Sequence, residues 1–62
     1  VSVLDHIEGI GPKRRQLLYE YYGTIDRIRE AAAEEMAAIP GMNRPSAEAV
    51  YNFFRAQEKL TN

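Results

Sequence analysis

The stretch GIGPKRR, residues 9–15, places two glycines and a proline directly before three consecutive basic residues. A glycine costs roughly 0.5–1 kcal/mol in the interior of a helix or strand, so two glycines one residue apart mark a place where the backbone itself has a task. Pro12 is favourable as the first residue of a helix, because its missing N–H would have no partner there. The stretch therefore predicts a tight loop that opens a helix.

The same arrangement returns later in the chain. A shift of 32 residues, the separation of Gly9 from Gly41, also lays Ile7 over Ile39 and Tyr19 over Tyr51. Six further pairs keep apolar character: Leu4 with Met36, Ile10 with Met42, Leu17 with Ala49, Leu18 with Val50, Tyr21 with Phe53 and Tyr22 with Phe54. The sequence therefore predicts a duplicated unit of helix, tight loop and helix. Neither copy closes a core alone, so we expect the two to pack face to face.

The segments between the glycines and prolines carry apolar residues at helical spacing, and none alternates as a strand does. We expect an all-α fold of five short helices in two pseudo-symmetric units. The expected bounds of the helices are about 3–7, 12–22, 24–31, 34–38 and 44–60. The first motif then covers about 3–22, the helix at 24–31 links the units, and the second motif covers about 34–60.

Local signals mark the ends of these helices. Ser2 followed by Asp5 has the spacing of a capping box, and Gly23 suits the left-handed position that ends a helix. Thr24 and Asn43 are the expected N-caps of the third and last helices. The residues expected to face inward from the second and third helices are Leu17, Leu18, Tyr21, Ile25 and Ile28.

Length and composition limit the classes of function. The 62 residues predict one domain, and the valine at position 1 leads us to expect a piece of a longer chain. A chain of this size buries only about 60% of the surface that its unfolded form exposes, so we expect no deep active-site cavity and no catalytic residues. No cysteine is present, which excludes disulfides. His6 has no second ligand at metal spacing, and we expect neither a metal nor a cofactor.

The chain is also expected not to associate with membranes. No apolar run approaches the roughly 18 residues that a spanning helix needs, and no charged and apolar leader opens the sequence. We expect a soluble, cytoplasmic and monomeric domain.

The charge distribution is more informative than the net charge of −1, which by itself argues against a nucleic-acid partner. Lys13, Arg14 and Arg15 are contiguous, and Arg44 stands beside the second loop. A glycine lets the backbone approach a ligand closely, and the N–H groups at a helix start favour an anion. The sequence therefore predicts two small phosphate-binding loops, which would hold nucleic acid without selecting its sequence.

IEGIGPKRRQLLYEYYG, residues 7–23, resembles a helix-hairpin-helix motif, and IPGMNRPSAEAVYNFF, residues 39–54, resembles a second copy. With the linking segment TIDRIREAAAEEMAAIPG, nearly the whole chain is similar to the C-terminal tandem helix-hairpin-helix domain of UvrC, the nuclease subunit of bacterial nucleotide excision repair. The resemblance implies a tandem hairpin fold of the SAM-like or RuvA C-terminal-like type. It also implies a non-catalytic DNA-binding module that favours bubbles and single-strand to double-strand junctions, with the other excision-nuclease subunits as partners of the parent chain.

The resemblance assigns phosphate contacts by position. The residues concerned are Gly9, Gly11, Lys13 and Arg14 in the first hairpin and Gly41, Asn43, Arg44 and Ser46 in the second.

The second hairpin departs from the first in two places. Asn43 stands where the first copy has Gly11, and we expect asparagine to tolerate the left-handed angles that the turn would need there. Pro45 stands where the first copy has Lys13, which removes an N–H and a charge. The second hairpin is therefore expected to bind phosphate more weakly than the first, through Arg44 and the hydroxyl of Ser46. Glu8 within the first hairpin is unfavourable near a phosphate.

Other interpretations remain open. The glycines could only turn the chain, and residues 13–15 could be a solvated helix face. The aromatic residues fit a core by their spacing, although an exposed Tyr19 or Tyr51 could stack on an unpaired base. The alternative function is a protein-interaction or dimerisation module of a repair nuclease.

A second basic cluster, distant from both loops in sequence, has a simple interpretation. Arg27 and Arg29 are expected to form surface ion pairs with Asp26 and Glu30.

Overall fold

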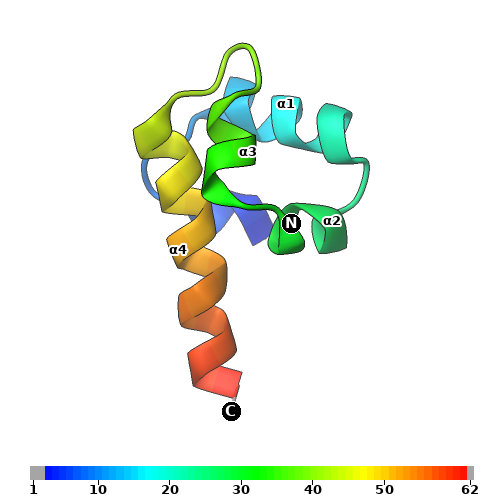
Figure 1. The fold of residues 1–62 in the computed structure, drawn as a ribbon. Helices are drawn as coiled ribbons and strands as arrows, with labels where there is room; N and C mark the ends of the chain where they lie inside the picture. Colours follow the sequence, from blue (N-terminus) through cyan, green and yellow to red (C-terminus); the bar gives the residue numbers. More distant parts are fainter. Residues whose placement is uncertain (1–2, 62) are drawn as a thin grey trace.

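The computed structural model describes residues 3–61, and that part of the chain consists of helices joined by turns and loops, without a strand. The elements are the 3-10 helix η1 (Val3–His6) and the α-helices α1 (Pro12–Tyr22), α2 (Ile25–Glu30), α3 (Ala33–Ala37) and α4 (Arg44–Thr61), drawn in Figure 1. The expected all-α fold is confirmed, with two related units joined by α2. The capping box expected at Ser2 lies outside the described residues.

The first helix is a single 3-10 turn that ends one residue earlier than expected. Ile7 donates its N–H to the carbonyl of Leu4 at 3.2 Å, which is the spacing of a 3-10 turn and not of an α-helix. The chain then enters the hairpin, so no second turn follows.

Proline and glycine set the ends of α1 as the sequence predicts. Pro12 is its first residue, and Gly23 ends it with φ of 85° while donating its N–H to Tyr19 O at 2.8 Å. Leu18 is fully buried, but the expected burial of Tyr21 is wrong, since Tyr21 is 60% exposed. Tyr22 instead lies on the same side as Leu18 one turn later, and its hydroxyl donates to Glu35 of the second unit at 2.9 Å. The inner face of α1 is therefore rotated from the predicted one.

The linking segment is shorter than expected because two alanines interrupt it. Thr24 caps α2 by accepting the N–H of Arg27 at 3.3 Å, and Ile28 is fully buried. Ala31 and Ala32 then have extended angles, with ψ of 145° and 150°, which separate α2 from α3. Helix α3 begins and ends one residue earlier than expected. The short α3 packs along α4.

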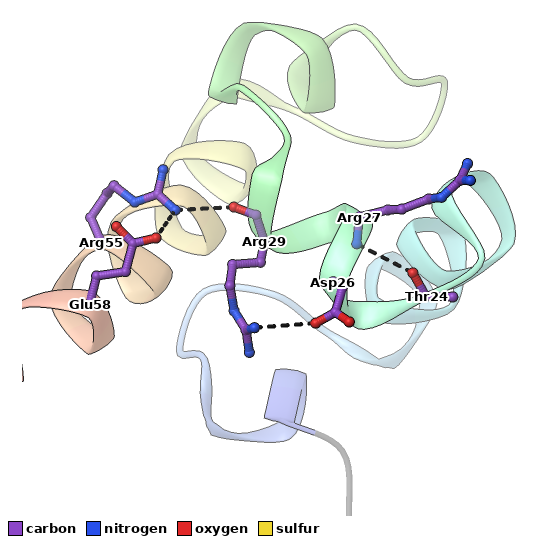
Figure 2. A network of polar contacts seen from close by, with 6 residues as sticks. All are labelled: Thr24, Asp26, Arg27, Arg29, Arg55 and Glu58. Atoms are coloured by element: carbon purple, nitrogen blue, oxygen red, sulfur yellow. Dashed lines mark hydrogen bonds and ion pairs between the residues drawn. The ribbon is translucent and has the colours of Figure 1, made fainter. Parts of the chain in front are cut away.

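A polar network joins α2 to α4 (Figure 2). Arg55 Nη2 donates to the carbonyl of Arg29 at 3.1 Å and to Glu58 Oε2 at 2.7 Å. The expected ion pair of Arg29 is confirmed with Asp26 at 3.2 Å. The pair expected for Arg27 is wrong, because its side chain points away from this network and has no acidic partner within residues 3–61.

Asn43 caps α4 as predicted, with Oδ1 accepting the N–H of Ser46 at 2.9 Å. The helix has 18 residues, and its C-terminal half projects from the body of the molecule (Figure 1).

The described residues share one core to which both copies contribute alike. Three pairs related by the 32-residue shift are buried on both sides: Leu4 with Met36, Ile7 with Ile39 and Leu18 with Val50. The other buried residues of the cluster are Ile10, Ile28, Ala31, Ala47 and Phe54. Face-to-face packing of the duplicated units is therefore what closes the core.

Candidate nucleic-acid interface

The two hairpins have nearly the same backbone. Gly9 has φ of 96° and Gly41 has φ of 95°, whereas no residue other than glycine has positive φ in the described part of the chain. These two glycines make the bends, because other residues are strained at such angles. Gly11 is extended, with φ of −94°, and Asn43 also lacks positive φ. The expectation that Asn43 replaces a left-handed glycine is therefore wrong, since this position is the N-cap of a helix in both copies.

Each hairpin packs on the long helix of the other unit. A β-carbon built on Gly9 would lie 3.6 Å from Cβ of Ala49, and one built on Gly41 would lie 2.6 Å from Cδ1 of Leu17. Leu17 and Ala49 are themselves related by the 32-residue shift, so the two contacts are one contact repeated by the pseudo-symmetry. The start of α1 and the loop before α4 consequently lie at the same end of the molecule (Figure 1).

Backbone donors are left unpaired at both bends. The first intrahelical bond of α1 runs from Arg15 N–H to Gly11 O at 3.1 Å, and no side chain caps this helix. Within residues 3–61, no acceptor lies within hydrogen-bonding reach of seven backbone N–H groups, those of Gly9, Gly11, Lys13, Arg14, Gly41, Asn43 and Arg44. The N–H groups of a first helical turn point out along the helix axis, where a phosphate oxygen can accept them.

Ser46 is the one predicted contact that the structure removes. Its side chain is buried, with 3% of the residue exposed, and its hydroxyl donates to the carbonyl of Gly9 at 3.4 Å. Its N–H donates to the capping Asn43. Both donors of Ser46 are thus used inside the protein, and the residue joins α4 to the first hairpin instead of facing a ligand.

The three contiguous basic residues have different roles. Arg15 forms an ion pair with Asp5 at 2.9 Å and so ties α1 to η1. Lys13 and Arg14 have no carboxylate partner among the described side chains. Arg44, beside the second hairpin, is exposed and lies 3.4 Å from Glu48. The free positive charge at the hairpins therefore belongs to Lys13 and Arg14.

A groove of about 470 Å³ runs between α1 and the second hairpin. Its lining residues are Lys13, Arg14, Gln16, Leu17, Glu20, Pro40 and Gly41. Gln16, Leu17, Glu20 and Pro40 were not predicted as part of the site. The groove forms between the two copies, so no signal within a single copy could have indicated it.

The aromatic residues mostly serve packing. Tyr19 and Tyr51 are both half-buried, and the guanidinium of Arg55 lies 4.9 Å from the centre of the Tyr51 ring. Stacking of either tyrosine on an unpaired base stays a prediction.

Two further features bear on the class of site. His6 is exposed, and no group of three or more His, Cys, Asp or Glu side chains in the described region could hold a metal ion. Among the described residues, no helix combines the length and apolar character needed to cross a bilayer.

Two bends that hold glycines at the same angles, each followed by a helix start with open donors, define a tandem helix-hairpin-helix domain. The chain matches the family model for the SAM-like helix-hairpin-helix tandem over residues 1–56, and it belongs to that family.

Among the curated proteins, this chain is similar to proteins named UvrABC system protein C. It is 46% identical over 57 residues to those of Acetivibrio thermocellus and Clostridioides difficile, and in each case the match covers 92% of this chain and 9% of the relative. It is 47% identical over 53 residues to that of Methanothermobacter thermautotrophicus, covering 86% of this chain and 9% of the relative. The chain thus spans about a tenth of the length of these relatives. No solved structure matches it.

Proposed function

We propose that this chain is a single DNA-binding domain that holds nucleic acid through backbone phosphates at its two hairpins. In a parent chain of the UvrC type it would place an excision nuclease for incision during nucleotide excision repair, together with the other subunits of that nuclease. The proposal gives the domain no catalytic role of its own.

One observation carries the proposal. Open backbone donors, at Gly9 and Gly11 in one hairpin and Gly41 and Asn43 in the other, accompany the unpaired cation of Lys13. Single loops of this kind bind an anion weakly, but two loops fixed on one core can hold successive phosphates of the same nucleic acid. Nothing in these contacts reaches a base edge, so the binding should be independent of sequence.

The two hairpins should contribute unequally. At the first three helical positions, α1 offers the N–H groups of Lys13 and Arg14, whereas α4 offers only that of Arg44. Pro45 has no N–H, and that of Ser46 is used by the cap. We expect the first hairpin to bind the better-held phosphate.

A titration of the labelled chain with DNA tests the proposal. Plain duplex and bubble-containing duplex are added separately, and the amide signals of both hairpins are followed. We expect shifts at Gly9, Gly11, Lys13, Gly41 and Asn43, larger shifts per added DNA for the bubble, and affinity that falls with salt at a log-log slope of about −3 to −4 for three or four phosphates. Shifts confined to other surfaces would show that the hairpins do not bind phosphate.

A protein-interaction domain is the second candidate, and one observation favours it. Tyr21 is 60% exposed and borders a depression of about 330 Å³ with Leu17, Ile39 and Pro40. An exposed aromatic side chain over apolar neighbours is typical of interfaces. Sedimentation of the chain over a range of concentrations distinguishes the candidates. A dimer whose formation does not change with salt or added DNA would support the protein-interaction domain and contradict the monomer that we expect.

A further inference from the structure

The groove between α1 and the second hairpin brings a cation of one unit to the loop of the other. Arg14 belongs to α1, the helix that follows the first hairpin, and it lines this groove with Pro40 and Gly41 of the second hairpin. By sequence position alone, Arg14 belongs to the first hairpin. The structure places it against the second one as well.

The guanidinium of Arg14 has no partner in the described part of the chain. It makes no ion pair there, and its Nε is buried without an acceptor. The comparison with Arg55 is informative, because Arg55 Nε is also buried and unpaired, but Arg55 Nη2 is held by a carbonyl and a carboxylate. The positive charge of Arg14 is therefore not neutralised by a described neighbour, and an anion that enters the groove could pair with it.

The pseudo-symmetry explains why this position reaches across. Ser46 is the residue equivalent to Arg14, and its hydroxyl crosses to the carbonyl of Gly9 in the opposite hairpin. In both copies the residue at this position therefore lies beside the hairpin of the other unit: Ser46 beside Gly9, and Arg14 beside Gly41. Serine is short and bonds to the protein itself, whereas arginine is long enough to present its donors to a ligand in the groove.

The charge that the second hairpin lacks can come from this residue. Pro45 stands at the position equivalent to Lys13, and Arg44 lies within 3.4 Å of Glu48. Glu20 also lines the groove, and Gln16 Nε2 donates to its Oε2 at 3.1 Å. Arg14 and Lys13 are then the two cations of the groove.

We propose that Arg14 supplies the cation for the phosphate held by the second hairpin, so that a basic residue of the first unit completes the binding site of the second. This inference rests on the proposed function. A guanidinium can bind two phosphate oxygens at once, which suits a site where the loop itself offers few donors.

Arg14→Gln and its control Lys13→Gln test the inference, since each removes one charge from the same helix start. The probe is one bubble-containing DNA, and the readout is the amide shift of each hairpin. We expect Arg14→Gln to reduce the shifts of Gly41 and Asn43 severalfold while those of Gly9 and Gly11 remain, and Lys13→Gln to do the reverse. Loss of one phosphate contact should weaken binding about eightfold in about 0.1 M salt and reduce the log-log slope by about 0.9.

Arg14→Lys adds a second check, because it keeps the charge without the two-pronged geometry. Arg14→Lys should have the wild-type log-log slope of affinity against salt, and the amide shifts of Gly41 and Asn43 should stay smaller than in the wild type. Two results would overturn this inference alone, provided that the amides of both hairpins shift in the wild type. Arg14→Gln would either leave the DNA-induced shifts of Gly41 and Asn43 unchanged, or reduce the shifts of both hairpins equally. If no hairpin amide responds in the wild type, the proposed function fails and this inference with it.

Discussion

Gly41 lies against Leu17 so closely that a β-carbon on the glycine would stand 2.6 Å from Leu17 Cδ1. The equivalent pair of the other unit, Gly9 and Ala49, leaves 3.6 Å between the corresponding carbons, which is ordinary contact. The pseudo-symmetry is therefore close in backbone angles but not in packing, because the helix of the first unit carries leucine where that of the second carries alanine. The second hairpin is held on its partner helix with less room than the first.

Gly41→Ala should destabilise the protein more than Gly9→Ala. Both substitutions place a side chain at φ near 95°, which costs about 1–3 kcal/mol, but only the first also displaces Leu17. Urea unfolding measures the two losses. In a Leu17→Ala background, adding Gly41→Ala should cost only the part due to the backbone angle, so the displacement part is the difference between the two backgrounds. A larger loss for Gly9→Ala would contradict this account of the hairpins.

Gly11→Ala separates folding from binding. The glycine has φ of −94°, and no heavy atom outside its chain neighbours lies within 4 Å of the place that an alanine methyl group would occupy, so the folded state admits alanine without strain. We expect the free energy of unfolding to change by less than about 1 kcal/mol, because the lower entropy of the unfolded chain and the poor N-cap preference of alanine oppose each other. DNA affinity should nevertheless fall, because the methyl group stands where a phosphate approaches the backbone.

Gly23→Ala is the matched control for Gly11→Ala. The φ of Gly23, 85°, is strained for alanine, although no heavy atom lies within 4 Å of the place of the added methyl group. The backbone strain alone should lower the free energy of unfolding by about 1 kcal/mol or more. Gly23 lies at the far end of α1 from the hairpins, and the substitution should leave DNA affinity unchanged. The opposite pattern, in which Gly11→Ala binds normally, would mean that this glycine has no ligand.

Signals that act within a few residues predicted much of the fold. Pro12, Gly23, Thr24 and Asn43 each mark a helix end through a local hydrogen bond or a fixed backbone angle, and all four were located correctly. The repeat predicted the core as well, because buried positions recur in both copies. These features depend on neighbours along the chain or on the 32-residue shift, and both are visible in the sequence.

Features that depend on how the two copies meet could not be predicted. Ser46 looked like a ligand contact because it follows a hairpin, but packing turns it toward Gly9. Tyr21 and Tyr22 are adjacent tyrosines, and the one that lies inward is the one whose hydroxyl meets Glu35 on the other unit. The groove beside Arg14 has the same origin, since one wall comes from each copy.

Lys13→Ala should weaken binding to all DNA sequences alike. Lys13 is exposed and has no carboxylate partner in residues 3–61, so its loss removes one phosphate contact and lowers the log-log salt slope by about 0.9. Arg44→Ala should have a smaller effect, because Arg44 is shared with Glu48. Fluorescence anisotropy over a range of salt concentrations measures both slopes.

Arg27→Ala is the control for the change in net charge. Arg27 also lacks an acidic partner in the described region, but it belongs to the linking helix α2 and not to a hairpin. It should leave the slope nearly unchanged. Equal effects of Lys13→Ala and Arg27→Ala would show that DNA responds only to total charge.

Tyr22→Phe should remove a dependence of stability on alkaline pH. Burial, with the hydrogen bond to Glu35 and its negative charge, raises the pKa of Tyr22 well above its ordinary value. Below a pH of about 10 the phenol is protonated in both states, and its contribution to stability is fully present. Above that pH the unfolded chain releases the proton first, so the free energy of unfolding falls as pH rises. The variant should lose about 1 kcal/mol near neutral pH, the usual value of one hydrogen bond.

Urea unfolding of the wild type and of Tyr22→Phe, at pH of about 8 and about 11, measures the effect. The difference in stability between the two proteins should shrink at the higher pH, because the wild type alone carries the Tyr22 proton that the unfolded state gives up. Tyr21→Phe is the control, since that ring packs edge-on against Tyr22 at 4.9 Å yet is largely exposed. It should follow the wild-type pH profile closely, since Tyr21 is the smallest of the causes that raise the pKa of Tyr22. A constant difference between wild type and Tyr22→Phe at both pH values would mean that Tyr22 ionises as easily in the folded protein as in the unfolded chain, and that its contact with Glu35 does not join the two units.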